Sequence, residues 1–323
     1  MSELKPIGEV LKGIIKEIPP NKKPNNNNDD DNNKINFDDL EICKFPRDVV
    51  EYNQNSNCLN STIIKDEGKT YMEKEFKNLS GYDYKVISLL PFNKNKTLFD
   101  LKVLLVISYL TDFFKRRFIT VSFTDFIKLL GVKDTGHYRR AIIKTLDYHT
   151  CTTYKFPYIW DFNKRQRNDD VPLTDKGIID YSKLTSFSVF HIINSYHIKN
   201  LNDLRSYKSR IEIELSQEFY HRFLNYYIVI DFKKAVKFKN PTSLNLYLFM
   251  KNNWGIKKSH KYSIGFEKLK KEIGITDTNK SRAKDTFKTA WREIKNQGLL
   301  PYISYYPSPS KTGKKNIHFK LVN

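Results

Sequence analysis

The sequence predicts an α+β fold, because one order of elements occurs twice along the chain. In each occurrence a buried helix and a short strand precede two amphipathic helices joined by a glycine turn, and a β-hairpin follows. The turns read GVKDT at 131–135 and GITDT at 274–278, with a phenylalanine eight residues before each glycine and an arginine eight residues after it. This order is that of a winged helix-turn-helix domain. We therefore predict two such domains in tandem.

The first predicted domain covers 85–205. Apolar periodicity and turn residues define its elements. They are a mostly buried helix over 97–117, a short strand over 118–122, helices over 123–130 and from about 137 to 149, and β-like runs over 152–162 and 185–198.

The second predicted domain covers 206–323 and repeats the order. Pro241 stands in the first turn of its buried helix, and Gly298 marks the end of its last helix. Its elements are a buried helix over 240–254, a short strand over 261–266, helices over 266–273 and 280–298, and a terminal hairpin over 299–322.

The N-terminal quarter of the chain, residues 1–84, has a different character. Residues 1–18 form an amphipathic helix by pattern, with apolar residues at steps of three and four. The apolar side of such a helix either packs against the rest of the protein or mediates self-association. Residues 19–34 are rich in Asn and Pro and predict a disordered linker. Residues 35–84 show no clean period, and we leave them as an unassigned lead-in.

The charge of the chain indicates a polyanionic partner. The formal net charge is +20, the pI is about 9.5 and the mean hydropathy is -0.59. Such a field concentrates nucleic acid by long-range attraction. The alternative source of the lysines is the codon bias of an AT-rich genome. Arginine is less affected by that bias, and Arg139, Arg140, Arg282 and Arg292 fall in or beside the second helix of the two repeated stretches.

Other classes of protein are disfavoured. Three cysteines without CxxC spacing suggest neither a disulfide framework nor a zinc site. No apolar run reaches the roughly 18 residues of a membrane span, and the N-terminus lacks the long apolar run of a signal peptide. We expect a cytoplasmic protein with no membrane partner.

Catalysis is not expected either. The seven histidines include no His-x-His pair, which a metal-dependent nicking enzyme of the rolling-circle type would need. No GxxxxGK[ST] phosphate loop and no Ser/His/Asp setting are present. We therefore predict a protein that is not an enzyme and that holds no cofactor or metal.

The second helix of each repeat is the candidate DNA-reading element. In the first copy, residues at helical spacing form a buried side made of Tyr138, Ile142, Leu146 and His149. The opposite side carries the candidates His137, Arg140, Lys144 and Tyr148. Arg139 lies nearer the buried side and is expected to snorkel or to contact a phosphate. Further basic candidates follow the helix at Lys155, Arg165 and Arg167.

In the second copy the expected buried stripe is Ala283, Phe287, Ala290 and Ile294, with Trp291 at its edge. A cationic ladder of Lys280, Lys284, Lys288 and Arg292 flanks this stripe, and Ser281 and Arg282 are further candidates. Thr278 or Asn279 is expected to cap the helix, whose N-terminus favours phosphate. The turn of the terminal hairpin adds Lys311, Lys314 and Lys315 as a basic wing.

Three stretches carry a resemblance to a known family. They are FTDFIKLLGVKDTGHYRRAIIKTLDYHTCTTY, the connection SRIEIELSQEFYHRFLNYYIVIDFKKAVKFKNPTSLNLYLFM, and FEKLKKEIGITDTNKSRAKDTFKTAWREI. Residues 85–323 resemble the replication initiator proteins of bacterial iteron-carrying plasmids, which have two tandem winged-helix domains. The resemblance rests on the order and spacing of elements.

This resemblance implies binding to repeated duplex sites at an origin, opening of adjacent AT-rich DNA, recruitment of the host initiator and replicative helicase, and repression of the protein's own promoter. It implies no catalysis. Residues 1–34 depart from the family's pattern, which puts in doubt the family's oligomerisation through the first winged helix.

Other functions stay open at this point. A winged-helix transcription regulator uses the same DNA-reading elements, and winged helices also serve as protein-interaction modules. A rolling-circle nicking initiator is the enzymatic alternative. Two unlike winged helices in one chain favour asymmetric, head-to-tail reading of direct repeats over binding to a palindrome.

Overall fold

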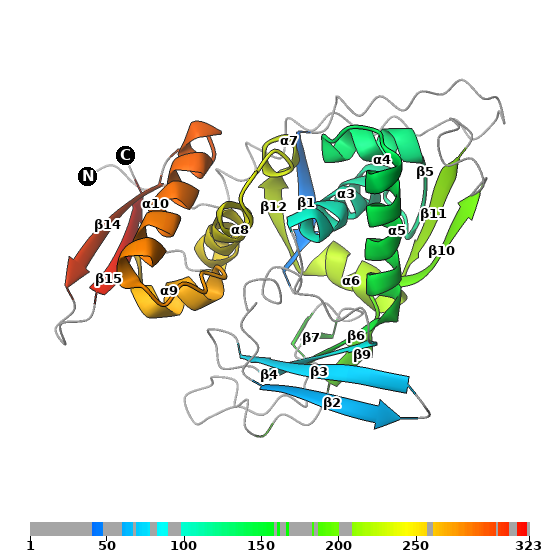
Figure 1. The fold of residues 1–323 in the computed structure, drawn as a ribbon, viewed down its shortest axis with the longest axis horizontal. Coiled ribbons are helices and arrows are strands. Elements are labelled where there is room, and N and C mark those ends of the chain that lie inside the picture. The colour runs from blue at the N-terminus through cyan, green and yellow to red at the C-terminus, as the bar shows by residue number, and fades with distance from the viewer. Residues whose placement is uncertain are drawn as a thin grey trace. The chain divides into compact units, whose positions relative to one another are not determined.

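The computed structural model has an α+β architecture with two winged helix-turn-helix units (Figure 1). It describes residues 41–47, 60–66, 69–77, 83–89, 98–157, 160–161, 166–167, 183, 187–199, 209–256, 261–301, 303–309 and 315–321. The helix predicted over 1–18 and the linker predicted over 19–34 lie outside these residues. Within the described part, no helix is both long and apolar enough to cross a membrane.

The first winged helix is built on three helices: α3 (Leu98–Phe114), α4 (Phe123–Leu130) and α5 (Gly136–Cys151), with β5 (Phe118–Ser122) between α3 and α4. The bounds of α4 are those predicted. Ser122 begins this helix, because its hydroxyl accepts the backbone N–H of Asp125 at 3.0 Å. Gly131 ends it in the left-handed region at φ 67, where other residues are strained.

The wing of this domain is formed by β10 (Ile193–Lys199) and β11 (Arg210–Leu215). Both join β5 in an antiparallel sheet of order β10-β11-β5. Ile211 and Ile213 of β11 pair with β5 and point into the core. The first winged helix therefore extends beyond residue 205, where the sequence analysis had placed its end. The strand β11 belongs to the first winged helix because it pairs with β5, and its local composition does not indicate this.

A second sheet assembles strands from separate parts of the chain. Its order is β2-β3-β4-β6-β9, and all neighbouring pairs are antiparallel (Figure 1). The strands are β2 (Asn60–Asp66), β3 (Lys69–Lys77), β4 (Asp83–Leu89), β6 (Thr152–Pro157) and β9 (Phe187–Phe190). The short strands β7 (Trp160–Asp161) and β8 (Gln166–Arg167) pair with each other and form a separate two-stranded sheet.

The unassigned lead-in over 35–84 therefore contributes strands to this sheet. The β-like run predicted over 185–198 is divided, because β9 joins the five-stranded sheet and β10 joins the wing. Tyr154 and Phe190 stack with ring centroids 6.1 Å apart and are both buried, which gives this sheet an aromatic contact between β6 and β9.

The lead-in also supplies β1 (Ile42–Pro46), which pairs with β12 (Tyr227–Asp231). Cys43 and Phe45 of β1 are buried, and the backbone N–H of Lys44 donates to the Asp112 carboxylate of α3 at 3.0 Å. Helices α6 (Gln217–Asn225) and α7 (Phe232–Ala235) flank β12 in the sequence.

The second winged helix follows the predicted order closely. Its elements are α8 (Pro241–Ile256), β13 (Lys261–Gly265), α9 (Phe266–Glu272), α10 (Lys280–Asn296), β14 (Ile303–Pro309) and β15 (Lys315–Leu321). The strands form an antiparallel sheet of order β13-β15-β14. Its core includes several aromatic rings: Tyr262, Phe266, Phe287 and Phe319 are all buried. Gly298 follows the last helix at φ 65, as its predicted stop.

Candidate nucleic-acid interface

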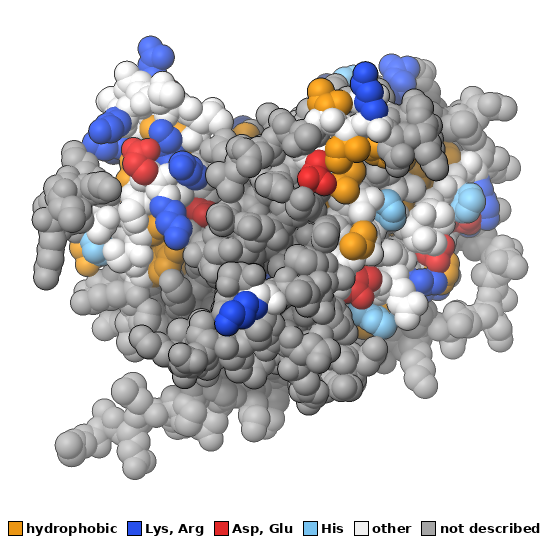
Figure 2. All heavy atoms as spheres, turned by 90° about the horizontal axis from the view of Figure 1, so that it is seen from below, with side chains coloured by type: hydrophobic (Ala, Val, Ile, Leu, Met, Phe, Trp, Pro, Cys, Tyr) orange, Lys and Arg blue, Asp and Glu red, His pale blue; other side chains and the backbone are white. Residues whose placement is uncertain are grey.

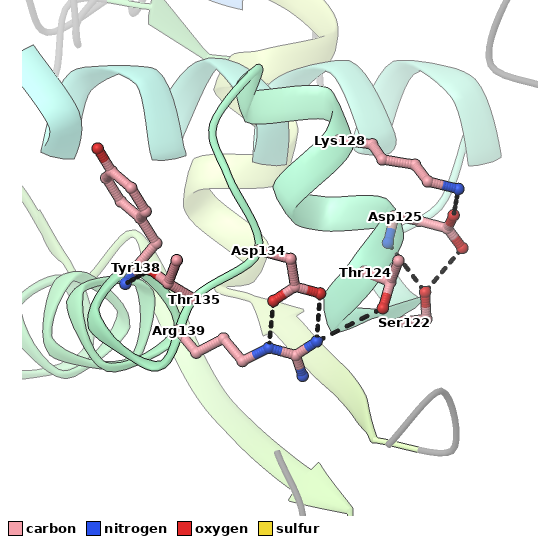
Figure 3. A network of polar contacts seen from close by, with 8 residues as sticks. All are labelled: Ser122, Thr124, Asp125, Lys128, Asp134, Thr135, Tyr138 and Arg139. Carbon is pink, nitrogen blue, oxygen red and sulfur yellow. Dashed lines mark hydrogen bonds and ion pairs between the residues drawn. The ribbon is translucent and has the colours of Figure 1, made fainter. Parts of the chain in front are cut away.

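Arg139 occupies the centre of the first helix-turn-helix (Figure 3). Its Nε donates to Oδ1 of Asp134 at 2.7 Å, and its Nη2 donates to Oδ2 at 2.6 Å. The guanidinium also lies over the ring of Phe123, 5.4 Å from the centroid, and Nη2 is 3.5 Å from Oγ1 of Thr124. Planar bidentate pairing of this kind fixes geometry as well as charge.

The assignment of Arg139 to the DNA-binding surface is therefore wrong. The residue is 0% exposed, and a side chain buried between α4 and α5 does not reach a phosphate. The physical reason is helical spacing. Arg139 stands three residues before Ile142 and seven before Leu146, which puts it on the same side of α5 as these two buried side chains. Arg139 positions α5 against α4.

The outward face of α5 carries the predicted set. His137, Arg140 and Lys144 are exposed and Tyr148 is half-buried, whereas Ile142, Leu146 and His149 are buried. Tyr138, expected on the buried side, is half-buried and stacks on Phe99 of α3 with centroids 5.7 Å apart. The face that sequence periodicity assigned to a ligand is thus the face that solvent reaches.

A polar contact joins α5 to the first wing. The Tyr196 hydroxyl of β10 donates to the Asp147 carboxylate of α5. Burial and this hydrogen bond raise the pKa of Tyr196 above its usual value. Neither residue was singled out from the sequence. This contact between β10 and α5 joins segments that are far apart in the sequence, so no local pattern identifies it.

The second helix-turn-helix places its candidates differently. Asn279 caps α10, and its side-chain oxygen accepts the backbone N–H groups of Ser281 at 2.9 Å and of Arg282 at 3.3 Å. The predicted stripe of Ala283, Phe287, Ala290 and Ile294 is buried, and Trp291 is 7% exposed at its edge. The exposed candidates are Thr278, Asn279, Lys280, Ser281, Arg282, Lys288 and Arg292, and Lys284 is half-buried.

The two turns differ in length by one residue. Four positions separate Gly131 from the cap Thr135, and five separate Gly274 from the cap Asn279. Each residue rotates a helix by about 100°. The arginine eight residues after the glycine is therefore buried in the first unit and exposed in the second, where it is Arg282. Alignment on the glycines, which the sequence suggested, is out of register for the second helices.

The second wing is held by aromatic packing. The ring of Tyr305 in β14 lies 4.9 Å from that of Phe287 and 5.1 Å from that of Trp291, both edge to face. Such pairs contribute beyond their buried area. The sequence marked Phe287 and Trp291 as buried, but it did not identify Tyr305 as their partner.

The remaining basic candidates lie where side chains are not described. Lys155 is in β6 of the five-stranded sheet, Arg167 is in β8, and Lys315 begins β15. Arg165, Lys311 and Lys314 lie outside the described residues. Figure 2 shows exposed Lys and Arg side chains on one face of the molecule, with some hydrophobic and acidic side chains beside them. Each winged helix carries exposed cations of its own.

In the part of the chain that the structure describes, no group of three or more His, Cys, Asp and Glu side chains is arranged to hold a metal ion. The candidate interface consists of cations, amides, hydroxyls and aromatic rings, which bind nucleic acid through phosphates, base edges and stacking.

Comparison with known proteins gives distant similarity. No protein-family model matches the chain, and no curated protein matches it. A crystal structure of RctB domains 2 and 3 aligns with 82% of this chain and 91% of its own, at 12% identity and a TM-score of 0.45. A second, from SeMet derivatives of the same domains, aligns with 81% and 90%, at 13% identity and a TM-score of 0.43. Function must be argued from the residues of this chain.

Proposed function

We propose that this chain is a sequence-specific duplex-DNA-binding replication initiator. In this proposal its two unlike winged helices bind direct repeats at an origin, promote opening of adjacent AT-rich DNA and recruit host replication proteins. The observation that carries the DNA-binding part is the recurrence of exposed cations on the outward faces of both α5 and α10, with an apolar stripe behind each.

Electrostatics supports a nucleic-acid partner. The net charge of +20 attracts a polyanion from a distance, and Arg140 and Lys144 of α5 and Lys288 and Arg292 of α10 place cations on the second helix of each unit. In helix-turn-helix proteins this helix enters the major groove, where arginine pairs with guanine and lysine contacts phosphate or base.

The presence of two unlike units supports the reading of direct repeats. A palindrome-binding repressor needs one winged helix per chain and gains the second by two-fold symmetry. Here α5 and α10 differ at most outward positions, so one chain reads its site asymmetrically. The order of elements, which resembles that of tandem winged-helix initiators, favours replication over the alternative role as a transcription regulator.

The decisive experiment is footprinting of the purified full chain on the DNA that flanks its own gene, with competitor duplex added. Protection of evenly spaced direct repeats beside an AT-rich tract is the expected result. Protection of one palindrome over the promoter would instead identify a transcription regulator. Absence of protection would contradict the proposed function and would favour winged helices that bind other proteins.

A titration at several salt concentrations tests the electrostatic basis separately. The logarithm of the binding constant should fall with the logarithm of salt concentration by about 0.9 per phosphate contact. A flat dependence would contradict binding through the cations of α5 and α10.

A further inference from the structure

The buried stripes bring the two candidate DNA-reading helices into register. Ile142, Leu146 and His149 of α5 then coincide with Phe287, Trp291 and Ile294 of α10, and all six side chains are buried. In this register Arg140 of α5 coincides with Asp285 of α10, and both side chains are exposed.

The shared stripes imply that both helices present the same side to the duplex. Contacts to phosphates fix the orientation of a protein on DNA and carry no sequence information, whereas contacts to base edges carry it. Sequence preference is therefore expected from outward positions at which the two helices differ. One of these positions differs in the sign of its charge: α5 has Arg140 and α10 has Asp285.

Asp285 lies on the outward face of α10, among cations. Its carboxylate is 67% exposed and lies 3.6 Å from Nζ of Lys288, itself 58% exposed. An exposed pair of this kind stabilises a helix little. A carboxylate that faces DNA repels phosphates and so weakens binding to any sequence. It does, however, accept a hydrogen bond from the amino group of cytosine in the major groove.

We propose that Asp285 determines the base preference of the second winged helix by accepting a hydrogen bond from cytosine N4. The first winged helix, with Arg140 at the same place, then reads a different sequence, and the repeat recognised by one chain consists of two unlike halves. This inference rests on the proposed function, because it needs duplex binding by both units.

The test is selection of binding sites from randomised duplex DNA by the full-length protein and by Asp285→Ala. The wild type should enrich cytosine at one position in one half of the site. The variant should lose that preference, with discrimination falling about tenfold or more. At the same time its affinity for unrelated duplex should rise, because a negative charge has left the interface.

Glu267→Ala is the matched control. Glu267 lies on α9, is 62% exposed and pairs at 3.5 Å with Lys270 three residues later, so the variant makes the same change of charge away from α10. It should leave the selected sequence unchanged. Arg140→Asp provides the reciprocal test, since it should introduce a new preference for cytosine in the other half of the site.

The outcomes separate this inference from the proposed function. If the wild type selects no duplex sequence, the proposed function is wrong. If the wild type selects a site and Asp285→Ala selects the same one with uniformly higher affinity, the proposed function stands. In that case Asp285 acts only through its charge, and the inference is wrong.

Discussion

The fourth residue after the cap of the second helix is buried in both helix-turn-helix units: it is Arg139, whose guanidinium lies between the two helices, in the first unit, and Ala283 in the second. Arg139 and Ala283 are both 0% exposed, yet one brings a charge into the core and the other brings a methyl group. The wings differ in the same sense. Tyr196 reaches α5 through a hydrogen bond to Asp147, while Tyr305 packs its ring against Phe287 and Trp291 of α10.

The difference shows that one arrangement of helices is held by two kinds of interaction. A buried cation is costly unless it is paired, so the first unit depends on the carboxylate of Asp134. Nη1 of Arg139 has no hydrogen-bond partner in the described part of the chain, which makes that dependence stronger. The second unit depends on apolar volume, and its stability should respond to the loss of rings. Four predictions test this contrast.

Truncation of the aromatic core of the second unit should have the largest effect. Phe287→Ala removes a ring that is 2% exposed and contacts Phe266 and Tyr305, and it should cost about 4 kcal/mol of unfolding free energy. Tyr196→Phe in the first unit keeps its ring and loses one hydrogen bond, at a cost of about 1.5 kcal/mol. Denaturant unfolding of both variants checks the order, and equal costs would contradict the contrast.

Loss of the partner of Arg139 should come next. Asp134→Ala leaves a buried guanidinium unpaired and should lower the unfolding free energy by about 3 kcal/mol. Arg139→Met fills the same space without charge, and because Asp134 is 37% exposed its carboxylate is then solvated. This variant should cost less than Asp134→Ala in the same denaturant titration.

Asp277→Ala is the control for this ion pair. Asp277 stands at the matching place in the second turn, but it accepts only the backbone N–H of Asn279, at 2.9 Å. Its loss should cost about 1 kcal/mol. If Asp277→Ala is as harmful as Asp134→Ala, the turn rather than the buried charge explains the effect.

Changes at the fifth position after each cap should alter the free energy of DNA binding, by less than the unfolding cost predicted for Phe287→Ala. Arg140→Ala should cost about 1 to 3 kcal/mol of binding free energy and relax specificity at one base position if Arg140 pairs with a base. Lys284→Ala should weaken all sequences alike and reduce the salt slope by about 1 if it contacts a phosphate. Competition titrations with matched and mismatched duplexes separate the two, and uniform weakening by Arg140→Ala would make it a phosphate contact too.

The helix caps should give the smallest effect. Asn279→Ala should cost about 1 kcal/mol, because its oxygen accepts two backbone N–H groups. Thr135→Ala should cost less, since the bond from the Tyr138 N–H to its hydroxyl is long, at 3.4 Å. Thermal or chemical unfolding measures both, and a larger loss for Thr135→Ala would contradict this order.

Periodicity and caps were enough to predict much of both units. The bounds of α4, the stripe from Ala283 to Ile294 and the outward set on α5 all followed from residue spacing. Among the candidates whose side chains are described, Arg139 is wholly buried, whereas we expected it to snorkel or to contact a phosphate. The position of a cap four or five residues after the turn glycine decides which side of the next helix an arginine faces.

The sequence by itself determined the elements that depend on neighbouring residues: amphipathic helices, glycine turns, caps and the repeated order. Only the tertiary structure decided which strands pair. It joined β1 to β12 and gathered β2, β3 and β4 into one sheet with β6 and β9. It also placed β11 beside β5 and buried Arg139 against Asp134. Helical periods and caps arise within a few residues, whereas strand pairing and the burial of a charge depend on segments that meet only in the folded chain.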